Sequence, residues 1–273
     1  NFIYQNKNNG SAIPLLKINQ QDLEDGKNLL NEIGVPKNKW YVTLHVREVG
    51  YRGETKNNTK EKFRNSDPLR YIDSIKEIVS QGGCVIRVGD SSMSKLPKIE
   101  GLIDYCHHKK RSEFLDIFLA ATSFFSLATS SGFWTLSRMF GTPVLLTNTS
   151  DLNQFFALRE KDILLPRLIK NKKDNQLLTF TEMFSFPISM INSDEHLDTL
   201  NLETVENTQS DLLYSTKEML LKCFTKDKAQ GSARQDKIKK ISEKIILDQL
   251  KIKQVAFASI SENFLQENEN LIR

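Results

Sequence analysis

Residues 124–148 read FFSLATSSGFWTLSRMFGTPVLLTN, and this stretch alone contains a complete strand-helix-strand unit. Its beginning, FFSLAT, is typical of a buried strand. The segment SGFWTLSRMFGT predicts a helix that ends near Gly141, and PVLLTN predicts a further strand. Strands that alternate with helices in this way belong to a parallel sheet, because the helix carries the chain back to the same edge. The stretch therefore predicts an α/β fold.

The same alternation extends toward the N-terminus. Residues 40–46 predict a strand covered on both faces, because apolar and β-branched residues follow one another with little alternation. Asp67 and Pro68 begin a helix that runs to about residue 80 and is closed by two glycines. Further elements are expected as strands at residues 84–90 and 102–105, and as a helix over residues 112–122 capped by Ser112. Residues 38–150 thus predict a doubly wound, mainly parallel, Rossmann-like sheet.

We expect three regions along the chain. Residues 1–37 hold a linker and a helix over residues 19–33, with Asn19 as its N-cap. Residues 38–222 form the Rossmann-like domain, and residues 223–273 form a helical C-terminal extension. The opening NFIYQNKNNGSAIPLL resembles the interior of a longer chain, so we also expect an upstream domain.

The segments after residue 150 give weaker signals. DILLP at 162–166 predicts a strand or an extended segment, TFTEMF starts a short helix, and a longer helix begins at Thr208. Residues 237–252 repeat apolar positions at Ile238, Ile241, Ile245 and Leu250 on a basic background. This pattern favours a surface helix packed on this or the upstream domain. The alternative is a helix that lies on a membrane surface.

Composition limits the class of protein. The 273 residues carry 38 Lys and Arg against 34 Asp and Glu, and this interspersed charge of +4 does not indicate a nucleic-acid binder. Cys84, Cys106 and Cys223 match neither a disulfide framework nor a zinc pattern, which favours a reducing, intracellular setting. No window is apolar enough to span a bilayer. We expect a cytoplasmic protein, with peripheral association at the inner membrane face as an additional expectation.

Polar residues gather where the predicted strands end. Ligands of open α/β sheets bind outside the carboxyl ends of the strands, so these residues are the candidates for a binding site. The first strand is followed by His45, Arg47 and Glu48, the second by Arg87, Gly89 and Asp90, the third by Asp104 and Tyr105, and the fourth by residues 128–132, ATSSG.

The last of these ends leads directly into a helix. Ser130, Ser131 and Gly132 would lie at the helix N-terminus, where unpaired N–H groups and the helix dipole favour an anion such as phosphate. The alternative is that one of the two serines only caps the helix.

His45 and Arg47 alternate along one strand and therefore point to the same side, so that one ligand can contact both. Arg47 supplies a fork that can bind phosphate oxygens in bidentate fashion. The alternatives are a buried histidine bonded to a carbonyl group, and a salt bridge from Arg47 to Glu48 or Asp90. In the following loop, residues 51–64, Arg52 and Arg64 are better candidates than the lysines, which are expected to be solvated.

Several motifs are absent from the sequence. No GxGxxG follows the first strand, there is no P-loop, and SSG lacks the second glycine of a nucleophile elbow. An Asp-x-Asp metal motif is also missing, and HHKKR at 107–111 has no convincing metal spacing. These residues instead allow a metal-free site in which arginine and helix ends neutralise a diphosphate.

Three segments together resemble the donor-binding half of GT-B glycosyltransferases: LHVRE, IRVGDSSM, and residues 114–148, FLDIFLAATSFFSLATSSGFWTLSRMFGTPVLLTN. They are most similar to a bacterial glycosyltransferase family that is distantly similar to fucosyltransferases. The resemblance is close over residues 39–148. Glu48 stands where many fucosyltransferases have Arg or Thr, so a preference for GDP-fucose does not carry over. Ala128 stands where the bacterial pattern usually has Gly, a change we expect to be tolerated.

The resemblance implies the C-terminal half of a GT-B enzyme that transfers a sugar from a nucleotide sugar to an acceptor hydroxyl, in the synthesis of surface polysaccharide or glycoconjugates. The acceptor would be a glycan, a lipid-linked glycan or a protein. Neither a metal nor another cofactor is expected. In this interpretation residues 38–222 bind the nucleotide sugar. The alternative is a non-catalytic sugar-nucleotide-binding or interaction module with the same fold.

The resemblance also implies roles for individual residues. Arg47 would stabilise the leaving diphosphate, His45 would contact it, and Asp90 would lie near the nucleoside. Glu48 and Asp90 are the candidate general bases, and the alternative that Glu48 only orients Arg47 or Arg52 has at least equal weight. The expected catalytic residues are Arg47, Glu48 and His45, and the expected donor-binding residues are His45, Arg47, Arg52, Arg87, Asp90, Ser130, Ser131 and Gly132.

Overall fold

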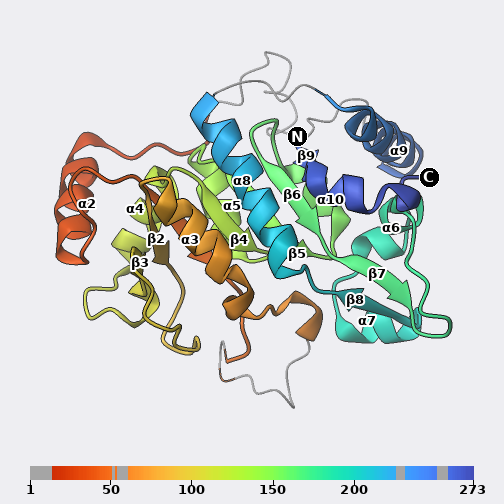
Figure 1. The fold of residues 1–273 in the computed structure, drawn as a ribbon, viewed down its shortest axis with the longest axis horizontal. Helices are drawn as coiled ribbons and strands as arrows, with labels where there is room; N and C mark the ends of the chain where they lie inside the picture. Colours follow the sequence, from red (N-terminus) through yellow and green to blue (C-terminus); the bar gives the residue numbers. More distant parts are fainter. Residues whose placement is uncertain (1–13, 51–52, 54–60, 226–230, 251–257) are drawn as a thin grey trace.

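The computed structural model describes residues 14–50, 53, 61–225, 231–250 and 258–273. Its centre is a seven-stranded sheet in the order β3-β2-β1-β4-β5-β6-β9, with all neighbouring strands parallel (Figure 1). The strands are β1 (Tyr41–His45), β2 (Cys84–Arg87), β3 (Leu102–Ile103), β4 (Ser126–Thr129), β5 (Val144–Thr149), β6 (Ile163–Pro166) and β9 (Ser259–Ile260). The order 3-2-1-4-5-6 is that of a doubly wound fold, in which the winding direction reverses between β1 and β4. The predicted α/β class is confirmed.

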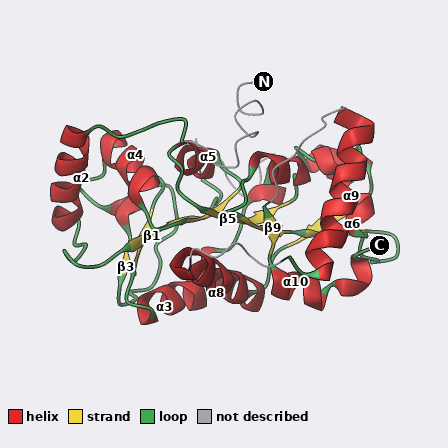
Figure 2. Cartoon of the chain, turned by 90° about the horizontal axis from the view of Figure 1, so that it is seen from above, coloured by secondary structure: helices red, strands yellow, loops and turns green. Residues whose placement is uncertain are grey.

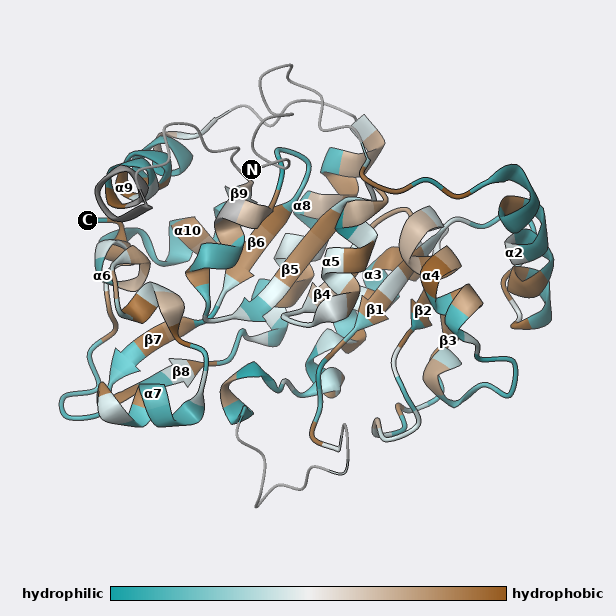
Figure 3. Ribbon diagram, turned by 180° about the vertical axis from the view of Figure 1, so that it is seen from behind, coloured by the Kyte–Doolittle hydropathy of each residue, from teal (hydrophilic) through white to brown (hydrophobic). Residues whose placement is uncertain are grey.

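Helices cover both faces of the sheet (Figure 2). One face carries α3 (Ile72–Ser80) and α8 (Gln209–Thr225), and the other carries α2 (Gln20–Glu32), α4 (Glu113–Thr122) and α5 (Gly132–Met139). Successive residues of a strand serve different faces: Val85 of β2 belongs to the core beneath α3, and Ile86 to the core beneath α4. Both faces are therefore dry, as the unbroken apolar strand sequences predict. In Figure 3, β5 and β6 are mostly hydrophobic, whereas the outer helices α2 and α9 are mostly hydrophilic.

Local capping signals fix the helix starts. The Asn19 side chain accepts a hydrogen bond from the Asp22 N–H at 2.8 Å, and Ser112 accepts one from the Leu115 N–H at 3.2 Å. The helix predicted from residue 67 begins as a 3₁₀ turn, η4 (Pro68–Tyr71), and continues as α3. These predicted starts are confirmed to within a residue, because each one depends on a short-range hydrogen bond.

A small subdomain follows β6. It contains β7 (Leu168–Asn171), α6 (Phe180–Phe184), the 3₁₀ turn η7 (Ile188–Met190), α7 (Asp194–Thr199) and β8 (Leu202–Val205). The strands β7 and β8 pair in antiparallel fashion and lie beyond the end of the main sheet (Figure 1). The helix start predicted at TFTEMF is α6, with a capping box between Thr179 and Glu182.

The C-terminal residues complete the main sheet. The chain from α9 (Ala233–Leu250) returns through β9, which pairs with β6, to α10 (Glu262–Glu267), which packs on α8 and α9. The boundary expected at residue 222 falls inside α8, and β9, which follows that boundary in the chain, supplies one strand of the main sheet. Ile238 of α9 is buried in the core, with Ile241 packed against it, as expected for a helix that packs on this domain. In the described part of the chain, no helix has the length and apolarity needed to cross a membrane.

Candidate functional site

The candidate site lies where β1 and β4 end side by side. His45 is in register with Ala128, and the Arg47 N–H donates to the Thr129 hydroxyl at 2.8 Å. The connections leave these two strands in opposite directions, so this is the switch point of the doubly wound sheet, where ligands of such sheets usually bind. Two of the four strand ends that the sequence analysis named, those of β1 and β4, are therefore neighbours in space.

His45 and Ser131 meet at the start of α5. The Ser131 hydroxyl lies 3.1 Å from His45 Nδ1, and Ser131 makes no side-chain capping bond although it is the N-cap residue. The alternative that this serine only caps the helix is therefore not what the structure shows. A Cβ added to Gly132 would meet no atom within 4 Å, so the first residue of α5 faces open space.

The imidazole of His45 is held in its neutral form. Its ring stacks on Phe133, with centroids 5.7 Å apart and planes 7° apart. Burial lowers the pKa of His45 to about 4, and the Arg47 guanidinium acts in the same direction. His45 can thus offer or accept a hydrogen bond at neutral pH but brings no charge. The sequence reasoning missed Phe133, whose position directly after Ser131 and Gly132 was the available signal.

Arg47 pairs with neither of its expected partners, Glu48 and Asp90. Its Nη2 lies 2.5 Å from Glu61 Oε2, and the same oxygen accepts a hydrogen bond from Arg64 Nη1 at 2.9 Å. Arg64 also donates through Nη2 to the Ser130 carbonyl oxygen at 2.9 Å. Two guanidinium groups and one carboxylate are therefore clustered beside the start of α5. The sequence-based prediction included Arg64 as a candidate but did not include Glu61.

Glu48 points toward β2. Its Oε1 pairs with Arg87 Nη2, while its Oε2 accepts from the Ser94 N–H at 3.1 Å and from the Ser94 hydroxyl. Arg87, which is fully buried, also donates to Asp104 Oδ1 at 3.0 Å and to the Ser94 carbonyl oxygen at 2.6 Å. Arg87 was expected to bind the donor and Glu48 to be a catalytic residue, but the two side chains form an ion-pair network with each other. This arrangement fits structural support better than catalysis.

The remaining candidates lie around the same edge. The Asp90 carboxylate accepts a hydrogen bond from the Ser92 N–H at 2.7 Å, within the turn after β2. Gly89 precedes it at φ 147°, and a Cβ there would collide with Met93. The Ser130 side chain is buried, and its oxygen accepts from Gln154 Nε2 at 2.7 Å. Arg52 lies outside the described residues.

A possible metal-ligand cluster lies near the end of β3. Ligand atoms of Asp104, Cys106 and His107 lie within 4.8 Å of one another. Asp104 is already paired with Arg87, and burial raises the pKa of the Cys106 thiol to about 12, with its hydrogen bond to Asp104 acting in the same direction. A neighbouring guanidinium and a protonated thiol both oppose cation binding.

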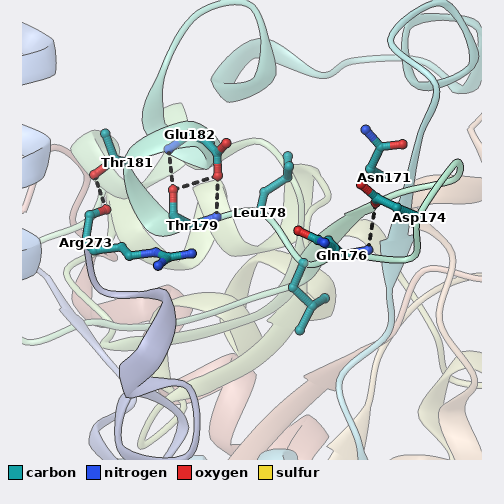
Figure 4. A pocket seen from close by; sticks show the side chains of 9 residues that line it. Asn171, Asp174, Gln176, Leu178, Thr179, Thr181, Glu182 and Arg273 are labelled. Carbon is teal, nitrogen blue, oxygen red and sulfur yellow. Dashed lines mark hydrogen bonds between the residues drawn. The ribbon is translucent and has the colours of Figure 1, made fainter.

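A hollow of about 500 Å³ lies in the subdomain, not at the β1–β4 edge (Figure 4). Its polar lining comes from the segment between β7 and α6, together with Arg273. Several of these groups bond to one another: Thr179 and Glu182 form the capping box, and the Thr181 hydroxyl donates to the Arg273 carbonyl oxygen. The hollow is thus separate from the candidate site.

Comparisons of the chain with protein-family models, with curated proteins and with solved structures found no match. No relative therefore supplies a role for any of these residues.

Proposed function

We propose that the protein is a glycosyltransferase that transfers a sugar from a nucleotide sugar to an acceptor hydroxyl, with the donor diphosphate bound at the β1–β4 edge. One observation carries this proposal: His45, Ser131 and the open start of α5 converge at the switch point of the sheet, with Arg47 and Arg64 beside them. Hydrogen-bond donors and positive charge at such a point suit a diphosphate.

The chemistry follows from the charge of the leaving group. When the acceptor hydroxyl attacks the anomeric carbon, the bond to the diphosphate breaks and negative charge grows on its oxygens. Arg47 and the N–H groups at the start of α5 would stabilise that charge, because donors fixed in place before the reaction need no reorganisation. Neutral His45 would add a hydrogen bond to a phosphate or sugar oxygen. This scheme uses no metal ion.

No residue at the β1–β4 edge is assigned as the general base of this reaction. Both oxygens of Glu48 are occupied by Arg87 and Ser94, so Glu48 would have to leave this network before it could accept a proton. We therefore assign Glu48 to support. In a GT-B enzyme the acceptor lies against the other half of the protein, so we propose that the residue activating the acceptor comes from there, and that the pathway is surface glycan or glycoconjugate synthesis.

The engagement of Glu48 also favours a second candidate. A module that binds a sugar nucleotide without turning it over needs the diphosphate site but no base. Such a module would keep Arg47, His45 and Ser131 as donor contacts.

Calorimetry with a panel of nucleoside diphosphates and sugar nucleotides, run in parallel with an assay of donor hydrolysis and transfer, separates the two candidates. Binding together with turnover supports the transferase. Binding without turnover in the full-length protein supports the module, and no binding by any member of the panel refutes both.

The site itself is tested with Arg47→Met. Loss of a charged hydrogen-bond donor to phosphate should weaken diphosphate binding by roughly tenfold to a hundredfold. Arg234→Met, which removes a surface arginine paired with Glu262 and Glu269, is the matched control and should bind like the parent. An Arg47→Met variant with the parent's affinity would remove this site from the proposal.

A further inference from the structure

We propose that Glu61 is an internal counterion that occupies the place of a phosphate group, and that Arg64 binds this phosphate together with Arg47 once the ligand arrives. The inference rests on the proposed diphosphate site and adds two residues and an exchange step to it. The ligand class is a diphosphate, free or within a nucleotide.

The geometry around Glu61 is that of a bound anion. A single oxygen, Oε2, lies 2.5 Å from Arg47 Nη2 and 2.9 Å from Arg64 Nη1. Arginine forks bind phosphate oxygens through the same kind of short, charge-assisted hydrogen bond. Arg64 is held in place by its second nitrogen, which donates to the Ser130 carbonyl oxygen, one residue before the N-cap of α5. The carboxylate therefore sits between two arginines at the edge where the diphosphate is proposed to bind.

Charge and burial explain why a carboxylate is needed there in the absence of ligand. The side chain of Arg47 is only 13% exposed, and two neighbouring guanidinium groups without an anion would repel each other. Glu61 is the most exposed member of the cluster, at 34%, against 27% for Arg64. A phosphate group carries more negative charge and more acceptor oxygens than a carboxylate, so it can replace Glu61 from the solvent side while both arginines stay paired.

The backbone next to Glu61 shows how the exchange can occur. The N–H groups of Lys62 and Phe63 donate to the carboxylate of Asp194, at the start of α7, at 2.7 and 3.0 Å. The Phe63 side chain is buried in the core. This segment, η3 (Lys62–Arg64), is thus attached to the subdomain independently of Glu61. A rotation of the Glu61 side chain can therefore break its contacts with the two arginines while η3 and Arg64 remain in place.

The test measures binding of inorganic pyrophosphate and of nucleoside diphosphates by calorimetry. Glu61→Gln removes the negative charge that competes with the ligand, and it should tighten binding by about threefold to twentyfold. This change in affinity corresponds to the free energy of two partly exposed ion pairs. Arg64→Gln should weaken binding by about tenfold. Glu203→Gln, in the surface pair with Lys170, and Arg234→Gln are matched controls and should bind like the parent.

Thermal unfolding supplies a second readout that does not depend on affinity alone. Without ligand, Glu61→Gln should melt below the parent, because two arginines lose their shared partner, and pyrophosphate should raise its melting temperature more than it raises the parent's. If the parent binds pyrophosphate and Glu61→Gln binds it equally or more weakly, Glu61 is not a counterion that the ligand displaces. An unchanged affinity in Arg64→Gln would remove Arg64 from the site. If neither the parent nor Glu61→Gln binds any diphosphate, the proposed function fails as well.

Discussion

The ion-pair network around Arg87 gives a prediction that decides the role of Glu48. If Glu48 supports the strand ends, then Glu48→Ala and Arg87→Met should both lower the free energy of unfolding, and the arginine variant should lose more. Arg87 is fully buried, whereas Glu48 is 10% exposed and Asp104 is 28% exposed. Methionine keeps most of the packing volume of the arginine chain, so the loss reports mainly on the charges.

The expected loss in the free energy of unfolding depends on which charged groups each substitution leaves without a partner. Arg87→Met leaves the carboxylates of Glu48 and Asp104 without their cation, and breaking such a buried pair costs about 3–5 kcal/mol. Glu48→Ala leaves Arg87 with two of its partners, Asp104 Oδ1 at 3.0 Å and the Ser94 carbonyl oxygen at 2.6 Å. We expect a smaller cost there, roughly 2 kcal/mol, at the low end for a buried charged group that loses one partner. The double variant should lose less than the sum of the two, because the groups share one network.

Urea unfolding followed by tryptophan fluorescence and circular dichroism measures these losses. Sugar transfer by the folded variants is measured beside them. The support role is refuted if Glu48→Ala unfolds within about 0.5 kcal/mol of the parent, a loss typical of surface substitutions away from any network. If that stable variant has also lost transfer, Glu48 is catalytic and the assignment to support is wrong.

Three further predictions concern other parts of the molecule. Because the folded pKa of His45, about 4, lies below its unfolded value of 6.5, the unfolded chain binds more protons between these values. Stability should therefore fall by about 3 kcal/mol as pH drops from 6.5 to 4, a loss that urea titrations should find reduced in His45→Gln. Ser131→Ala should cost about 1 kcal/mol, the contribution of its hydrogen bond to His45, and should weaken pyrophosphate binding in calorimetry. Gly26→Ala should lower the melting temperature, because a Cβ would lie 2.1 Å from the Phe118 ring; an unchanged value would show that α2 does not pack tightly on α4.

The parallel sheet and its helices could be predicted because their signals are local. Unbroken apolar runs mark β1, β2, β4 and β5, and side chains such as Asn19 and Ser112 form caps within three residues of themselves. The subdomain strands β7 and β8 and the pairing of β9 were not predicted. The strand β9 has only two residues and joins β6 across more than ninety positions of sequence, so that its place depends on tertiary packing.

The candidate site was predictable in its position but not in its contacts. Parallel strands end at one edge whatever their side chains, so the meeting of His45 with Ser131 follows from the topology. The partner of Arg47 does not follow from the topology, because Glu61 lies 14 positions further along the chain in a stretch whose sequence carries no periodic signal. Gln154, which bonds to Ser130 from the 3₁₀ turn η6 (Leu152–Ala157), was not predicted either.

The alternation of one strand explains why Arg47 and Glu48 have different partners. Val42, Leu44 and Val46 belong to the core beneath α3, as does Val85 of β2. Val85 lies two residues before Arg87, so the two side chains point to the same face of the sheet. Tyr41 belongs to the core beneath α4, against which Phe133 packs. Extended to the end of the strand, this period places Glu48 on the side of Arg87, and His45 and Arg47 on the side of α5. A salt bridge between the adjacent residues Arg47 and Glu48 would have had to cross the sheet. The polar residues at the end of β1 are thus divided between two faces: Glu48 joins the ion-pair network with Arg87, and His45 and Arg47 lie on the side of the proposed ligand site.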